Sequence, residues 1–218
     1  MSSLDVRRAP SVAARPSPAA AGLALVLVAL FVIVADEVAL GRTLAFDLAA
    51  HRVVYKDIGP RLEGVMKVGP LLGTSALLCA PLMIVWLLYH RRLSSALALS
   101  VSEAGAFVLY VTLKGLFHRV RLGDAAPANV FGYLFPSGHA LASIVTFGLL
   151  GYLIAVRCRG WARAGVVVAT AGVVAFVALS LVYLDTHYIT DVLGGLVVGG
   201  AWLTLSITGL RLVEAPSR

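Results

Sequence analysis

Four residues in a row, Pro136-Ser137-Gly138-His139, stand directly before an uncharged stretch of the chain. Serine is a favoured helix N-cap, glycine lets a ligand approach the backbone, and the free amides at a helix start attract anions. A histidine at this place can donate a proton to a leaving oxygen. The run predicts an anion site with its own acid, and the plainer alternative is a helix cap beside an interfacial histidine.

Two cations precede this run, Lys114 and Arg121. A separation of seven residues is about two helical turns, so on one helix both side chains point the same way. Two long cations that converge suit a doubly charged phosphate. Taken alone, the pair is better explained as side chains that extend from a helix end toward water.

His187 and Asp191 form the third polar group. A spacing of four places them on one helical face or across one turn. The carboxylate can hold the imidazole in one tautomer, which leaves the other ring nitrogen free to act as a nucleophile. By itself the pair is weak evidence, because an acid often lies near a histidine by chance.

In order and spacing, the three groups together resemble the type 2 phosphatidic acid phosphatase (PAP2) superfamily, which also includes vanadium haloperoxidases. Its pattern is Lys-x6-Arg-Pro, then Pro-Ser-Gly-His, then Ser-Arg-x5-His-x3-Asp. The second motif is complete here, and the others read Lys114 to Arg121-Leu122 and Ser180-Leu181-x5-His187-x3-Asp191. The motifs cover residues 114 to 191.

The resemblance implies a role for each residue. His187 would attack phosphorus and form a phosphohistidine, Asp191 would orient His187, and His139 would protonate the leaving oxygen and then activate water. The phosphoryl oxygens would be bound by Lys114, Arg121, Ser137 and the Gly138 amide. Such a site would need no metal and no cofactor, because fixed cations stabilise the developing charge.

Two positions depart from the family pattern. Leu122 replaces the proline, and Leu181 replaces an arginine that in relatives would grip the phosphate. A hydrogen bond to a charged group contributes about 1.5–3 kcal/mol, so its loss would lower the rate roughly ten- to a hundredfold. Arg119 is an accessory candidate for the missing contact.

The composition indicates a membrane protein. Of 218 residues, 60% are hydrophobic and 13% are charged, against about 25% charged in soluble domains. We expect an all-α integral membrane protein, a bundle of six transmembrane helices. The net charge of +7 fits loop arginines and anionic lipid headgroups. Nucleic acid binding is not expected, because no long basic run occurs.

The predicted spans are uncharged stretches, apart from Glu103 in the third, and they lie at 19–35, 68–89, 93–113, 140–156, 164–184 and 192–210. Residues 41–67 read as a loop with a short amphipathic helix, and residues 114–138 as a polar loop. Glu103 is either a functional-site candidate or a neutral acid hydrogen-bonded between helices.

The domain prediction is a disordered cytoplasmic tail at 1–18, a PAP2-like membrane domain at 19–211 and a short tail at 212–218. Arginines are dense in the short connections on the side of the termini, so we expect that side to be cytoplasmic and the polar groups to face outward. The compact form is typical of a bacterial inner-membrane protein.

The function predicted from these residues is hydrolysis of a membrane lipid phosphate, with a polyprenyl diphosphate such as undecaprenyl diphosphate or a phosphatidic acid type lipid as substrate. One alternative is a degenerate, non-catalytic protein that binds or transports lipid phosphates, for which Leu181 is the best argument. A remote alternative is an intramembrane serine protease that uses Ser137 and His187, although it leaves Lys114 and Arg121 unexplained.

Overall fold

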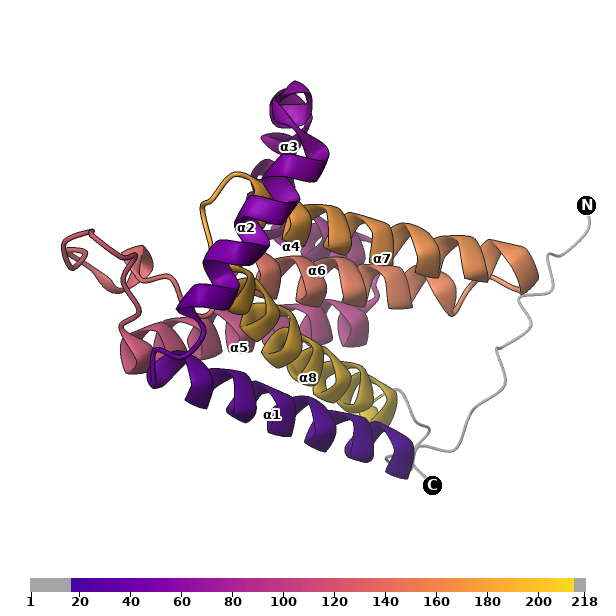
Figure 1. The fold of residues 1–218 in the computed structure, drawn as a ribbon. Helices are drawn as coiled ribbons and strands as arrows, with labels where there is room; N and C mark the ends of the chain where they lie inside the picture. The colour runs from indigo at the N-terminus through magenta and orange to yellow at the C-terminus, as the bar shows by residue number, and fades with distance from the viewer. Residues whose placement is uncertain (1–16, 214–218) are drawn as a thin grey trace, which may run out of the picture.

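The protein is described by a computed structural model covering residues 17–213, without the side chains of residues 77–79. This part of the chain is all-helical (Figure 1). Its elements in order are α1 (Pro18–Ala39), α2 (Leu44–Ile58), η1 (Pro60–Leu62), α3 (Glu63–Met66), α4 (Val68–Tyr89), α5 (Leu93–Phe117), η2 (Val130–Gly132), α6 (Gly138–Ala155), α7 (Gly160–Tyr183) and α8 (Ile189–Val213). The fold class predicted from composition is confirmed.

Within residues 17–213, five helices are long and apolar enough to cross a bilayer, namely α1, α5, α6, α7 and α8. The segments Pro60–Ala76 and Ala80–Tyr89 meet at a bend of 45°. They form a sixth span if the bent pair is counted as one membrane crossing. Pro81 lies inside this helix, and proline is the usual cause of so sharp a bend. The predicted spans match these helices to within a few residues.

Helix α6 lies at the centre of the bundle and packs against α4, α5, α7 and α8, while α1 covers α8 from outside. The α8 face toward α6 carries glycines, among them Gly195 and Gly199. A Cβ on Gly195 would lie 2.5 Å from the Ser137 carbonyl oxygen, so glycine lets α8 approach the start of α6 closely. This close approach brings the two helix ends that carry the polar motifs together.

Helix α2 lies across one end of the bundle, over the end of α7 and the start of α8 (Figure 1). Its ring contacts include Tyr55 stacked on Tyr183, with ring centroids 5.4 Å apart. His51 Nδ1 lies 2.9 Å from the Val182 carbonyl oxygen. The amphipathic helix predicted within residues 41–67 is therefore present and is fixed to the end of the bundle that carries the motifs.

Two sequence expectations are corrected by the helix bounds. The polar loop begins after Phe117, so Lys114 lies in the last turn of α5 and not in a loop. The helix ends because His118 adopts a left-handed conformation with φ of 46°. Arg121 consequently lies beyond the helix, and Lys114 and Arg121 do not share a helical face. The predicted tails fall mostly at 1–16 and 214–218, outside the described residues.

Candidate active site

The start of α6 is built by the Pro-Ser-Gly-His motif. Ser137 is the N-cap, and its hydroxyl accepts a hydrogen bond from the Ala140 amide at 3.4 Å, as predicted. The Ser137 amide donates to the Asp191 carbonyl oxygen at 2.9 Å, which joins α6 to α8. A Cβ on Gly138 would lie 2.5 Å from the Tyr110 ring, so only glycine allows α5 to approach this helix start.

His139 projects from the first turn of α6 toward α4. Its Nε2 lies 3.2 Å from the Thr74 hydroxyl, which itself donates to the Pro70 carbonyl oxygen at 3.0 Å. The Thr74 oxygen therefore keeps its lone pairs for an N–H of the imidazole. A Cβ on Gly73 would lie 3.0 Å from the His139 Cβ, so Gly73 provides the space in which the ring sits.

His187 lies in the turn between α7 and α8. The Leu181 carbonyl oxygen accepts from the amides of Thr186 at 3.1 Å and His187 at 3.4 Å, which fixes this turn to the end of α7. The His187 side chain is 11% exposed, and its Nδ1 lies 3.9 Å from Asp191 Oδ2. The predicted pair is thus brought together, at a separation too long for a hydrogen bond.

The charge state of His187 follows from its surroundings. Burial lowers the pKa of His187 to about 3, and the charges of Lys114, His139 and Arg121 act in the same direction. His187 is consequently a neutral imidazole at physiological pH, with a lone pair available on one ring nitrogen. Lys114 and Arg121, the two cations predicted from the sequence, are therefore among the positive charges that lower the pKa of His187.

The rings of His139 and His187 lie close together, one edge toward the other. Their ring centroids are 6.3 Å apart and the rings are inclined at 64°. They come from the first turn of α6 and from the turn before α8, which the Ser137–Asp191 backbone bond holds side by side. Both imidazoles therefore lie close together at the same end of the bundle.

Lys114 is almost wholly buried, with 3% exposure. Its ammonium group donates to the carbonyl oxygen of Phe131 at 3.1 Å and also to that of Tyr133. The Tyr110 ring lies 5.2 Å from the same nitrogen, which adds a cation–π contact. These contacts anchor the loop before α6 to the end of α5 around a buried positive charge.

Arg121 pairs with Asp185, with Nη1 2.8 Å from Oδ2, and also donates to the Asp185 carbonyl oxygen. Asp185 adopts a left-handed conformation, with φ of 53°. Its carboxylate is 46% exposed, so this ion pair lies at the rim of the site. Tyr188 places its ring between Arg121 and Arg119, 5.0 Å and 4.8 Å from their guanidinium carbons.

Arg119 lies between two carboxylates. It contacts Asp191 Oδ1 at 2.5 Å and Asp47 Oδ2 at 2.6 Å, and also reaches the Thr190 and Thr43 hydroxyls at 2.8 Å and 3.0 Å. Asp47 comes from α2 and was not identified from the sequence. The signal for it was weak, since an acid in the first turn of an amphipathic helix is ordinary.

Leu181 and Leu122, the two residues that differ from the family motifs, differ in burial. Leu181 is 1% exposed and packs in an apolar cluster with Ala140, Val177, Val182 and Val192. The Leu122 side chain is exposed, and its amide donates to the Tyr188 hydroxyl at 3.4 Å, a bond that proline lacks the N–H to make. Position 181 therefore belongs to the core beneath the site.

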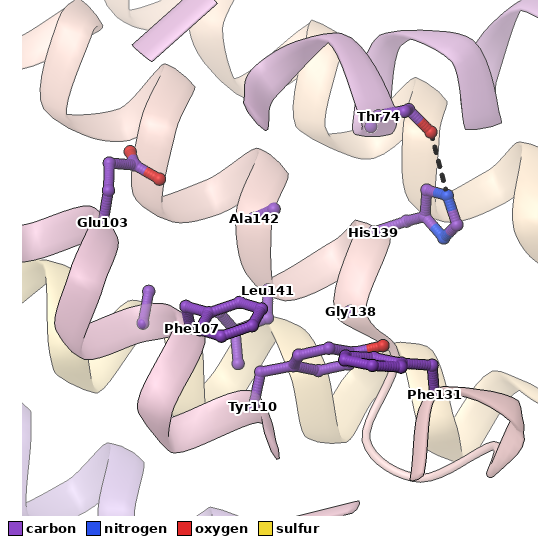
Figure 2. A pocket seen from close by; sticks show the side chains of 11 residues that line it. Thr74, Glu103, Phe107, Tyr110, Phe131, Gly138, His139, Leu141 and Ala142 are labelled. Atoms are coloured by element: carbon purple, nitrogen blue, oxygen red, sulfur yellow. Dashed lines mark hydrogen bonds between the residues drawn. The ribbon is translucent and has the colours of Figure 1, made fainter. Parts of the chain in front are cut away.

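A cavity of about 220 Å³ extends from His139 along α5 and α6 (Figure 2). Its wall is mostly apolar and includes Phe107, Tyr110 and Ala142, and Glu103 lines it as well. Glu103 Oε1 accepts a hydrogen bond from the Thr146 hydroxyl at 2.8 Å, so it is hydrogen-bonded between α5 and α6. Among the side chains that the structure describes, those of residues 17–76 and 80–213, no group of three His, Cys, Asp or Glu is arranged to hold a metal.

The fold and the site together define an integral membrane protein with a cation-lined pair of histidines at one end of a helical bundle. The family model of the PAP2 superfamily matches residues 95–212, and the chain belongs to this superfamily. The resemblance inferred from the three motifs is thereby confirmed.

The chain is similar to a characterised protein and to a solved structure, both from Bacillus subtilis. Phosphatidylglycerophosphatase B of Bacillus subtilis (strain 168) is 27% identical over 173 residues, which cover 78% of this chain and 85% of that protein. The crystal structure of a transmembrane PAP2 type phosphatidylglycerolphosphate phosphatase from Bacillus subtilis matches with a TM-score of 0.76 at 23% identity, covering 89% of this chain and 98% of that one. This second likeness confirms the transmembrane fold.

Proposed function

We propose that this protein is a lipid phosphatase that hydrolyses a membrane lipid phosphate through a phosphohistidine on His187. The observation that carries the proposal is the close pair of histidines, whose ring centroids are 6.3 Å apart and on which the charges of Lys114 and Arg121 act. A nucleophile and an acid on opposite sides of one phosphorus atom can support in-line displacement.

In the first step, neutral His187 attacks phosphorus through Nε2, because Nδ1 faces Asp191. The bond from phosphorus to the lipid oxygen breaks, and His139 gives its proton to that oxygen. The 3.9 Å gap to Asp191 shortens as the phosphorylated imidazole gains positive charge, a change common between free and loaded active sites. In the second step, His139 takes a proton from water, and the hydroxide releases phosphate from His187.

The phosphoryl oxygens are proposed to be bound by Lys114, Arg121, Ser137 and the Gly138 amide. Arg121 must exchange part of its contact with Asp185 for the substrate, which is feasible because the Asp185 side chain is 46% exposed and can be solvated. The Ser137 hydroxyl uses a lone pair for the helix cap, so its hydrogen remains able to donate to phosphate. No metal enters either step.

The substrate is proposed to be a glycerolipid phosphate of the phosphatidylglycerophosphate or phosphatidic acid type. The relative in Bacillus subtilis carries phosphatidylglycerophosphatase in its name, and the cavity beside His139 is lined with apolar residues suited to the lipid part. A polyprenyl diphosphate is the comparison substrate. With the termini in the cytoplasm, the site faces the outer side of a bacterial inner membrane.

The test is phosphate release by the purified protein in detergent with a chelator present. The substrates are phosphatidylglycerophosphate, phosphatidic acid and a polyprenyl diphosphate. His187→Asn should abolish release, whereas His118→Asn, an exposed histidine in the nearby loop, should leave it intact. Equal release from wild type and His187→Asn would refute the phosphohistidine mechanism, and release lost with the chelator would refute metal independence.

A second candidate is a non-catalytic protein that binds lipid phosphates at a degenerate site. The burial of Leu181 in the apolar cluster favours it, because the cation of the third motif is missing from the site. This candidate predicts that vanadate raises the melting temperature while none of the three lipids is hydrolysed. The protease alternative is disfavoured, since it gives no role to Lys114 and Arg121, whose positive charges act on His187.

A further inference from the structure

Asp47 is the one fully buried residue on helix α2. The rest of this helix is largely exposed, so an apolar side chain would have anchored it at lower cost. Burying a carboxylate is costly, and the attraction to a partner offsets this cost only when the geometry is good. A buried charge at the anchoring point of an amphipathic helix therefore calls for a reason other than packing.

The contacts of Asp47 lead directly to the candidate active site. Oδ1 accepts from the Thr190 amide at 3.0 Å and from the Thr190 hydroxyl at 2.9 Å. Oδ2 accepts from Arg119 at 2.6 Å. Thr190 is adjacent to Asp191 in the first turn of α8, so Asp47 holds both the backbone and the cation that position Asp191.

Asp191 is held through both of its carboxylate oxygens. Its Oδ1 accepts from Arg119 at 2.5 Å, and its Oδ2 accepts from the Tyr188 amide at 2.8 Å. Oδ2 is also the atom that lies 3.9 Å from His187 Nδ1. The chain of contacts thus runs Asp47–Arg119–Asp191 and ends at the imidazole.

We infer that Asp47 and Arg119 are positioning residues that set the orientation and the charge of Asp191. Two carboxylates share one guanidinium, so the group of three carries one net negative charge. Without the charge on Asp47, Arg119 would neutralise Asp191 completely, and the carboxylate would stabilise a charged imidazole less well. This inference rests on the proposed function and assigns Arg119 to the carboxylate and not to the phosphate.

The experiment compares Asp47→Asn with Asp57→Asn, an exposed acid on the same helix. Asparagine keeps an oxygen for Thr190 but removes the charge beside Arg119. Asp47→Asn should lower kcat about ten- to a hundredfold, since a charged hydrogen bond is lost, with KM and vanadate binding unchanged. Asp57→Asn should match wild type in all three.

Arg119→Lys is the second variant, because lysine keeps the charge but cannot contact both carboxylates through a planar fork. It should also lower kcat, and the Asp47→Asn/Arg119→Lys double variant should be no slower than Arg119→Lys alone. Unchanged kcat in folded Asp47→Asn, or losses that multiply in the double variant, would overturn the inference. Loss of vanadate binding along with kcat would also overturn it, as simple structural damage. If wild type releases no phosphate, the proposed function fails and this inference fails with it.

Discussion

Gly73 makes room for the proposed acid, and its replacement by alanine measures how finely His139 is placed. The new Cβ would lie 3.0 Å from the His139 Cβ and 3.1 Å from Cδ2, whereas ordinary contact begins at 3.4 Å. The imidazole must therefore move by about 0.4 Å. Because a misplacement of about 1 Å can cost about 100-fold in rate, a shift of this size should lower kcat about sixfold.

The assay for Gly73→Ala uses two leaving groups. With a lipid phosphate, departure of the alkoxide needs the His139 proton, so the full loss is expected. With nitrophenyl phosphate, whose leaving group needs little protonation, the loss should nearly vanish. Gly172→Ala is the matched control, since a Cβ on Gly172 meets nothing within 4 Å. Equal losses for both substrates, or the same loss in Gly172→Ala, would refute the assignment of His139 as the acid.

Three further predictions follow from the same geometry. Leu181→Arg restores the family residue but places a guanidinium in an apolar cluster. It should therefore destabilise the protein by about 3 kcal/mol without raising activity. A faster enzyme with an unchanged melting temperature would contradict this prediction. The His187 imidazole should stay neutral in nitrogen NMR spectra between pH 7 and pH 5. Since its folded pKa of about 3 lies below the ordinary value of 6.5, the unfolded chain binds the extra proton in that window, and stability should fall as pH falls; protonation of His187 near pH 6 would refute the burial argument. Thr74→Val should lower kcat about threefold, because His139 loses one hydrogen bond. If kcat and the pH–rate profile stay unchanged, the Thr74 hydroxyl does not orient the His139 ring.

The membrane helices could be predicted from the sequence because long uncharged runs need only composition to be recognised. The Ser137 cap was also predictable, since it depends on residues three positions apart. The Lys114–Arg121 geometry was predicted wrongly, because the left-handed His118 ends α5 between them. No general rule forces a histidine into that conformation, although it is tolerated there more readily than bulky residues are.

The Asp47–Arg119–Asp191 group could not be predicted. Arg119 lies 72 positions from each of the two aspartates, and such pairing depends on how α2 crosses the end of the bundle. The burial of Leu181 in an apolar cluster could not be predicted either, because the motif indicates only that an arginine is missing at this position. The orientation of its side chain into the cluster with Val177 and Val192 is a property of the packed helices.

The most direct test of the central claim is rapid-quench labelling with a lipid substrate that carries radioactive phosphate. The wild-type protein should gain an acid-labile, alkali-stable label on the peptide that contains His187 within the first turnover. His187→Asn should gain none, and His139→Asn should form and release the label more slowly. Phosphate release from wild type without any label on His187 would contradict the account, because the lipid phosphate would then be hydrolysed without the proposed intermediate.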